Sequence, residues 1–329
     1  MTSISLVDIL KAREVVKKSR SVVRTPMLTN VQTRLGLEKG SVDINLKLET
    51  MQRSGSFKMR GLTNQLANAP SSVLDGSRKL VTMSAGNYGR AFAQALHERN
   101  LKGVVCMPET APENRCQLIQ GYGISVERMT STELMTTVKR HVIEDGMTFL
   151  HPFDDMNLIQ GYGSCGLEIL EDVPEVDLVL VCCGGGGLVA GIAAAIKLSG
   201  KTDCQVVAVE PEAAPSMYQS RLDGKPATIT PKPTIAAGLA PPFTGGICFD
   251  LAQQFVDDVV LVSEQDIISA VETLYGIGLV VEPSGAAGMA ALLAGRVDNV
   301  SSKRVVIVLT GSNVSPKELD KLVSDNVKK

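Results

Sequence analysis

The chain has 329 residues, of which 44% are hydrophobic, enough to build a sizeable core in one large domain or two compact lobes. Its formal net charge is -2, its pI is about 6.0, and it contains three histidines and no tryptophan. It therefore has no basic field that would attract nucleic acid or an anionic membrane, and few residues for a histidine metal site. This composition and nearly neutral charge favour an enzyme that acts on small molecules.

The cysteines and the N-terminal segment indicate a reducing compartment. The seven cysteines are odd in number and form no CxxC pair, and residues 1–20 lack the apolar region of a secretory signal. We therefore expect unpaired core thiols and a cytoplasmic protein. The apolar run over residues 178–198 is about as long as a membrane span, but four consecutive glycines divide it. We accordingly predict no membrane segment.

Short β-branched runs alternate with segments of helical period along most of the chain, which predicts an α/β fold with mostly parallel strands. In chain order, the expected strands are 45–49, four that begin near residues 79, 103, 123 and 147, and then 178–183, 205–209, 259–263 and 304–309. The four strands in the middle predict a small lobe over residues 79–154, inserted into a large lobe made of 1–78 and 155–329.

Helix starts are expected where capping sequences occur. These are Thr130–Glu133, Ser263–Asp266 and Ser315–Glu318, and Pro316 suits the first position of the last helix. The loop over residues 228–248 is rich in proline and glycine and is long for a compact domain. We therefore expect it to have a function.

Lys58 follows the first strand and precedes a helical pattern that begins near Met59. A helix N-terminus disfavours positive charge, so a lysine amine there loses its proton more readily. A lysine with a lowered pKa is what a nucleophile that forms a Schiff base needs. Most lysines at such positions are solvated surface groups, so this segment alone leaves both interpretations open.

A run of four glycines lies between the strand over 178–183 and the next helix; they are Gly184, Gly185, Gly186 and Gly187. Without side chains, their backbone N–H groups can converge on an anion at the helix N-terminus. Neither the Gly-Lys-Ser/Thr of a nucleotide P-loop nor the GxGxxG spacing is present, so a phosphate monoester fits best. The alternative is a tight turn without a ligand.

Two further turns follow strands. Ser84–Gly89 offers backbone donors for a carboxylate, and the Asn87 amide can bond a phenolic or carboxylate oxygen. Thr310 places a hydroxyl at the carboxyl end of the last strand, where α/β proteins bind ligands. A simple helix cap and an ordinary loop are the respective alternatives.

Together these segments resemble the fold-type II pyridoxal-phosphate enzymes, in the branch that contains serine and threonine dehydratases and serine racemases. The matching motifs extend from Arg24-Thr25-Pro26 through SGSFKMRG (54–61), SAGNYG (84–89), HPFDD (151–155), GGGGL (184–188), VEP (209–211) and VEPSGA (281–286) to the loop after Thr310. The resemblance implies a two-lobed fold similar to the tryptophan synthase β subunit, with mostly parallel twisted sheets flanked by helices. It also implies pyridoxal 5'-phosphate as cofactor, an amino acid as substrate, and a homodimer.

The resemblance also implies a role for each residue of the site. Lys58 would hold the cofactor as a Schiff base, with Phe57 beside the ring, and the glycines 184–187 would hold the phosphate. Asn87 would bond the phenolic oxygen, Gly238 would lie at the ring edge, Glu282 near the ring, and Thr310 at the pyridine nitrogen. The loop that binds the substrate carboxylate, the substrate loop, would consist of Ser84, Ala85, Gly86, Asn87 and Tyr88.

Thr310 and Ala85 favour elimination. A neutral hydroxyl does not hold the pyridine nitrogen protonated, so it stabilises a carbanion less than a carboxylate would. Loss of the β-hydroxyl is then favoured over transamination. Lys58 would remove the α-proton, and the cofactor phosphate would protonate the leaving hydroxyl. In serine racemases the residue at position 85 is a serine that exchanges a proton on the opposite face, whereas alanine has no such proton.

We therefore predict a dehydratase that converts L-serine, L-threonine or a related β-hydroxy amino acid into a 2-keto acid and ammonia. A serine racemase, in which Tyr88 would replace the missing serine, is the alternative. A non-catalytic carrier of pyridoxal phosphate or an amino-acid sensor is a third hypothesis. The choice between serine and threonine stays open, because one methyl group changes binding by only about 1–3 kcal/mol.

Three positions depart from the pattern of the relatives. A cation site in that family uses a glutamate, a backbone carbonyl and an acid; Glu210 and Ala214 match, but Ser216 replaces the acid. This favours a weak or monovalent site, or an ordinary loop carboxylate with no ion. Ala237 replaces an aspartate, which disfavours a nucleotide effector. The chain ends soon after the last expected helix, so we expect no regulatory domain and no feedback by isoleucine.

Overall fold

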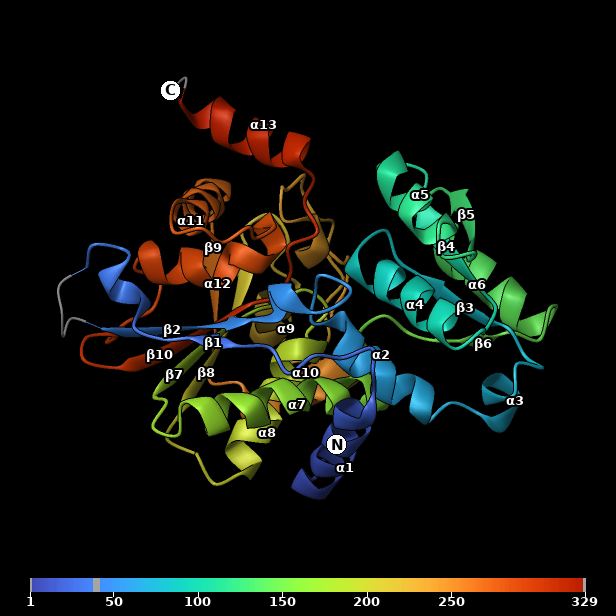
Figure 1. The fold of residues 1–329 in the computed structure, drawn as a ribbon, viewed down its shortest axis with the longest axis horizontal. Coiled ribbons are helices and arrows are strands. Elements are labelled where there is room, and N and C mark those ends of the chain that lie inside the picture. The colour runs from blue at the N-terminus through green and yellow to red at the C-terminus, as the bar shows by residue number, and fades with distance from the viewer. Residues whose placement is uncertain (1, 38–41, 328–329) are drawn as a thin grey trace.

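The computed structural model describes residues 2–37 and 42–327, and these form two sheets flanked by helices (Figure 1). The larger sheet has six strands in the order β1-β2-β10-β7-β8-β9, and only the β1–β2 pair is antiparallel. Its strands are β1 (Met27–Leu28), β2 (Asp43–Leu48), β7 (Leu178–Cys182), β8 (Gln205–Pro211), β9 (Asp258–Val262) and β10 (Arg304–Leu309). The predicted α/β fold with mostly parallel sheets is confirmed.

Alternate residues of the large sheet point to opposite faces, and helices cover both faces (Figure 1). Val179 and Val181 belong to the apolar cluster that contains α7 (Met156–Asp172) and α8 (Gly187–Leu198). Leu178, Leu180 and Cys182 belong to the cluster that contains residues of α11 (Glu264–Gly276) and α12 (Pro283–Leu293). Burial on both faces explains why these strands are apolar throughout instead of alternating with polar residues.

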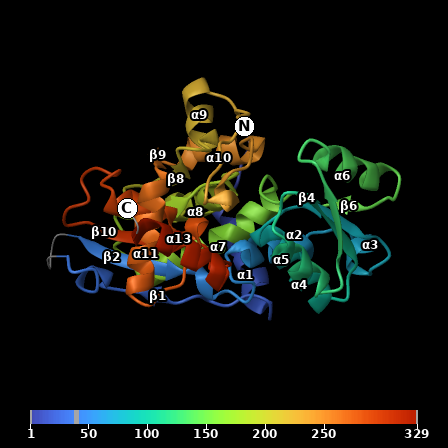
Figure 2. The ribbon, with the colours of Figure 1, turned by 90° about the horizontal axis from the view of Figure 1, so that it is seen from above.

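The smaller sheet is wholly parallel, in the order β5-β4-β3-β6. Its strands are β3 (Leu80–Met83), β4 (Gly103–Pro108), β5 (Ser125–Met129) and β6 (Thr148–Phe149). Helices α4 (Asn87–Glu98) and α5 (Glu113–Gln120) cover one face, and α6 (Leu134–Ile143) covers the other. All four strands lie within 79–154, to one side of the large sheet (Figure 2). This supports the predicted small lobe, whose boundaries stay a prediction.

The remaining elements connect or flank the sheets. They are α1 (Leu6–Lys18), α2 (Lys58–Ala67), α3 (Ser71–Leu74), α9 (Ser216–Asp223), α10 (Gly246–Phe255), α13 (Pro316–Val327) and the short 3-10 turns Val31–Thr33, Glu49–Met51 and Ala237–Leu239. The predicted capping box of Ser263 and Asp266 is confirmed. The predicted start of α6 was too early, because the bond from the Thr130 N–H to Glu133 closes a turn, and the helix begins only at Leu134.

The cysteine prediction is confirmed, since all seven are buried and unpaired. Within the described residues, no helix combines the length and the apolar composition that a bilayer crossing needs.

Candidate active site

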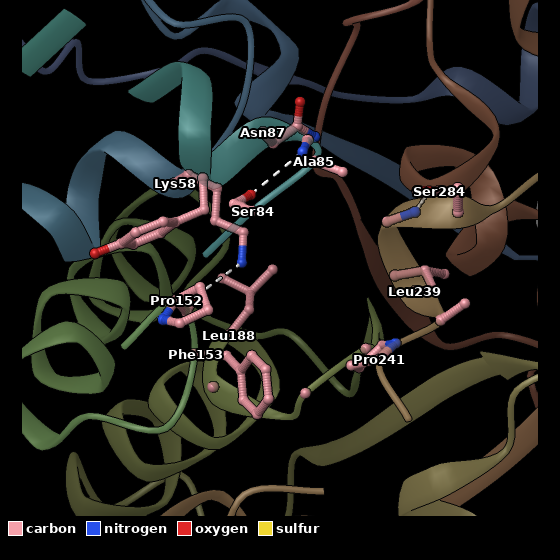
Figure 3. Close-up of a pocket in the computed structure, with 18 of the residues that line it drawn as sticks. Lys58, Ser84, Ala85, Asn87, Pro152, Phe153, Leu188, Leu239, Pro241 and Ser284 are labelled. Carbon is pink, nitrogen blue, oxygen red and sulfur yellow. Dashed lines mark hydrogen bonds between the residues drawn. The ribbon is translucent and has the colours of Figure 1, made fainter. Parts of the chain in front are cut away.

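Lys58 lies at the first position of α2, between the two lobes. The preceding backbone is held by the last strand, because Ser56 pairs with Gly311 and the Phe57 N–H donates to the Thr310 carbonyl at 3.0 Å. The side chain extends toward Pro152, whose carbonyl lies 3.4 Å from Nζ (Figure 3). The short connection between β2 and α2 thus places the lysine amine at the carboxyl ends of the large-sheet strands.

The Lys58 side chain is partly buried in the wall of a cavity, and its surroundings lower the pKa of its amine. Burial lowers its pKa to about 8, although Cys248 and Glu282 oppose this shift. Nζ lies 4.8 Å from the centre of the Phe57 ring and about 6 Å from the Tyr88 and Tyr162 rings. Because of the lowered pKa, more of this amine is unprotonated near neutral pH than of an ordinary lysine, as a nucleophile or base requires.

A buried ion network fixes α2. Arg60, two residues after the lysine, donates to Glu49 at 2.8 Å and to Glu168 of α7 at 2.7 Å, and none of the Arg60 side chain is exposed. Lys47 of β2 donates to the same Glu168 at 2.7 Å. The network ties α2 to both β2 and α7, so the helix that carries the amine has one orientation relative to the large sheet.

The four glycines form the turn between β7 and α8, as the sequence predicts. Gly186 has φ +94°, a conformation that residues with a side chain rarely adopt. A Cβ on Gly185 would lie 2.2 Å from the Phe153 ring, and one on Gly187 would lie 2.7 Å from the Phe153 carbonyl. Backbone is thus packed where no side chain fits, directly at the N-terminus of α8. This cradle suits a phosphate group.

The loop before α4 has the geometry of an anion-binding turn. The Ser84 hydroxyl oxygen accepts the N–H groups of Gly86 at 3.2 Å and Gly89 at 3.0 Å, and α4 begins at Asn87. The N–H groups of Asn87 and Tyr88, at the same helix start, have no partner within the helix and can bind a ligand. The Ala85 carbonyl accepts a bond from Arg115 of α5 at 3.3 Å.

Asn87 takes part in a polar chain that crosses the cleft. Its side-chain amide donates to Glu282, and its carbonyl oxygen accepts from Asn313 at 2.6 Å. Asn313 is bonded in turn by Arg90. Burial raises the pKa of Glu282, and the bond from Asn87 counteracts this rise. Because the Asn87 amide faces Glu282, its predicted bond to a phenolic oxygen stays a prediction.

Thr310 and Gly238 lie on the large-lobe side of the cleft. The Thr310 hydroxyl is 3.4 Å from the Cys182 sulfur, at the ends of the neighbouring strands β10 and β7. The Gly238 N–H donates to the Ser284 hydroxyl of α12 at 3.0 Å (Figure 3). Ser284 therefore holds the 237–239 turn of the long loop against the site.

Tyr88 is directed into the protein interior. Its hydroxyl donates to the Gln65 side chain at 2.6 Å, and burial, followed by the charge of Asp155, raises the pKa of Tyr88 well above its ordinary value. A phenol in this state is a poor proton donor to a substrate. The structure thus argues against Tyr88 as the second base that a racemase would need.

The residues predicted for a cation come together, but at the start of α9. The buried Glu210 carboxylate accepts the N–H groups of Met217 and Tyr218 at 2.8 Å each, and burial raises its pKa to about 7. Ser216 Oγ lies 3.4 Å from the carboxylate, and the Ala214 carbonyl accepts the Ser216 N–H. These bonds account for the buried carboxylate as a helix cap, so a cation here stays a prediction.

One cavity of about 350 Å³ gathers all of the predicted cofactor and substrate residues. They are Phe57, Lys58, Ser84, Ala85, Gly86, Asn87, Tyr88, Gly184, Gly185, Gly186, Gly187, Gly238, Glu282 and Thr310. Arg115, Tyr162 and Ser284 also line it and were missed. Ser284 lies within the VEPSGA motif and could have been found there, whereas no local pattern singles out Arg115.

The comparisons with known proteins agree with this site. The L-threonine ammonia-lyase of Thermotoga maritima is 36% identical over 312 residues, which cover 92% of this chain and 77% of the relative. The serine racemase of Dictyostelium discoideum is 34% identical over 330 residues, which cover 98% of this chain and 99% of the relative. The structure of maize serine racemase superposes with a TM-score of 0.87 at 30% identity and covers 99% of both chains.

A family model described as "Pyridoxal-phosphate dependent enzyme" matches residues 19–311. The match spans both sheets and every residue of the cavity. It confirms the resemblance predicted from the motifs, and the chain belongs to the pyridoxal-phosphate-dependent enzyme family.

Proposed function

We propose that this enzyme eliminates water from a small β-hydroxy amino acid, such as L-serine or L-threonine, and yields a 2-keto acid and ammonia. The observation that carries the proposal is the Lys58 amine, which has a pKa of about 8 and lines the same cavity as the substrate loop over residues 84–88. Ala85 stands where the resemblance to serine racemases implies a serine that exchanges a proton, and alanine has no exchangeable proton. Relatives named as threonine ammonia-lyases are consistent with this reaction.

The residues of the cavity fit pyridoxal 5'-phosphate. The cradle of Gly184–Gly187 would bind the phosphate, Lys58 would hold the aldehyde carbon, and Thr310 would face the pyridine nitrogen. When bound, this cofactor supplies an electron sink for the bond that breaks at the α-carbon. A neutral hydroxyl at position 310 would leave that sink weaker than a carboxylate would, which favours prompt loss of the β-substituent.

The side chains and backbone of the protein would bind the substrate and transfer its protons. The N–H groups at the start of α4, with the Ser84 hydroxyl, would orient the substrate carboxylate. Lys58 would take the α-proton on one face of the substrate, and the β-hydroxyl would leave with a proton as water. The released enamine would then add water and lose ammonia, which balances the reaction to one 2-keto acid and one ammonia.

A serine racemase is the second candidate, because relatives with this name match nearly the whole chain. That reaction needs a second proton donor on the face opposite Lys58. Ala85 has none, and the Tyr88 hydroxyl is bonded to Gln65. Elimination is therefore favoured over racemisation.

A panel of β-hydroxy amino acids, assayed for ammonia release and for product chirality, tests the proposal. We expect keto acid and ammonia from L-serine or L-threonine, loss of turnover in Lys58→Ala, and full turnover in the exposed control Lys225→Ala. Rapid interconversion of L- and D-serine would favour the racemase, and turnover that survives in Lys58→Ala would overturn the assignment of the base.

The seven unpaired, buried cysteines support a reducing compartment, so we also propose a cytoplasmic location. We propose a homodimer by analogy with the family. Light scattering of the purified enzyme tests the dimer, and a monomeric mass would exclude it.

A further inference from the structure

A cysteine, a glutamate and a histidine meet at the face of the small sheet that α6 covers. Cys106 lies on β4, Glu127 on β5 and His141 on α6, and their Sγ, carboxylate oxygen and ring nitrogen all lie within 4.8 Å of one another. Cys106 and His141 are buried, whereas the Glu127 side chain is 38% exposed. None of the three is among the described residues that line the active-site cavity.

The histidine is oriented as a metal ligand would be. Its Nδ1 lies 2.6 Å from Asp145 and its Nε2 lies 3.1 Å from Glu127. A carboxylate that accepts the Nδ1–H fixes the tautomer and leaves the Nε2 lone pair facing Glu127. Metal-binding histidines are usually held by such a second carboxylate.

We propose that Cys106, Glu127 and His141 bind one Zn²⁺ ion. Thiolate, imidazole and carboxylate together are ligands that Zn²⁺ accepts in tetrahedral geometry, with bonds of about 2.0–2.3 Å. Such bonds place ligand atoms roughly 3–4 Å apart, so the cluster needs only small side-chain movements. The Arg140 side chain, which lies 3.5 Å from Glu127, would turn outward to solvent.

An open cavity of about 560 Å³ borders the cluster and is lined in part by Ser125, Glu127, His141 and Asp145. It gives an ion access and leaves the fourth coordination position to water. The bound ion would link two strands to the C-terminal half of α6. The site is therefore expected to stabilise the small lobe and to be independent of the dehydratase reaction.

Metal titration of the cofactor-loaded enzyme tests the proposal. After treatment with a chelator, Zn²⁺ alone is titrated by calorimetry, and Co²⁺ is added separately as a spectroscopic probe of the thiolate. We expect one equivalent per chain and a thiolate-to-cobalt charge-transfer band that is absent in Cys106→Ser and retained in the buried control Cys116→Ser. Asp145→Asn should weaken binding roughly 10- to 100-fold.

The cofactor absorbance and ammonia release of each variant report whether it is folded. Glu127→Gln, at a half-exposed position, provides a second test if the Cys106 variant does not fold, and it too should lose the bound equivalent. Zn²⁺ binding that is unchanged in Glu127→Gln and His141→Ala would overturn the proposal, as would a cobalt band that persists without Cys106. No stoichiometric binding to the wild-type enzyme would also overturn it and would leave the cluster as a hydrogen-bonded ion network.

Discussion

Replacing Lys58 with methionine is expected to stabilise the cofactor-free protein while it abolishes turnover. The Lys58 side chain is partly buried, and desolvation lowers the pKa of its amine from an ordinary value of 10.5 to about 8. This lowering corresponds to about 3 kcal/mol of the free energy of unfolding at neutral pH, because one pKa unit is worth about 1.4 kcal/mol. Methionine has a similar length and no charge, so it removes this destabilisation without opening a large cavity.

The pH dependence of stability distinguishes this cause from others. The destabilisation is fully present below about pH 8, where the buried amine must bind a proton. Between about pH 8 and 10.5 the unfolded chain binds that proton and the folded chain does not, so the stability of the wild type rises relative to the variant. Above pH 10.5 both states are neutral and the difference vanishes.

Urea unfolding of both cofactor-free proteins, followed by circular dichroism at neutral and alkaline pH, measures this difference. Lys225→Met, at an exposed position, is the matched control and should change little. A Lys58→Met protein that is less stable than the wild type at neutral pH would refute the reasoning. So would a difference that does not shrink as the pH rises.

Three further substitutions test the packing and the chemistry of the site. Arg60→Leu leaves buried carboxylates unpaired and should destabilise the protein by about 3–5 kcal/mol in the same urea assay. The double variant Arg60→Leu, Glu49→Leu should recover much of that stability, and an equal loss in both variants would contradict the ion-network account. Gly185→Ala places a Cβ 2.2 Å from an aromatic ring and should weaken cofactor binding, measured by absorbance titration. Gly276→Ala, which has open space around it, is the control and should bind the cofactor unchanged. Unchanged affinity in Gly185→Ala would exclude the glycine turn as the phosphate-binding site. Ala85→Ser adds a hydroxyl at position 85 and should raise the rate of D-serine formation relative to ammonia release. An unchanged ratio on chiral chromatography would show that position 85 does not set the outcome.

The sequence predicted the parts of the site that depend on short stretches of backbone. Four glycines between a strand and a helix have few structural solutions, so their position and their anion-binding geometry follow from local rules. The same holds for Lys58, because the strand, the short turn and the helix around it are adjacent in the chain. The alternation of strands and helices likewise determined the α/β fold.

Contacts between distant segments were not predictable in this way. The chain of Asn87, Glu282 and Asn313 joins three turns that are far apart in sequence, and its pairing depends on the final packing of the lobes. The motif left Glu210 as either a cation ligand or an ordinary loop carboxylate, and its bonds to the N–H groups of α9 could not be foreseen from the sequence. The start of α6 was misplaced because a threonine and a glutamate three residues apart can close a turn as well as cap a helix.

The product formed from L-serine by the enzyme loaded with pyridoxal 5'-phosphate tests the central claim most directly. Ammonia and pyruvate should appear in equal amounts, with little D-serine, and all three should be absent in Lys58→Ala. If D-serine forms faster than ammonia, a second proton donor must lie opposite Lys58, and the assignment of one base acting on one face would be wrong.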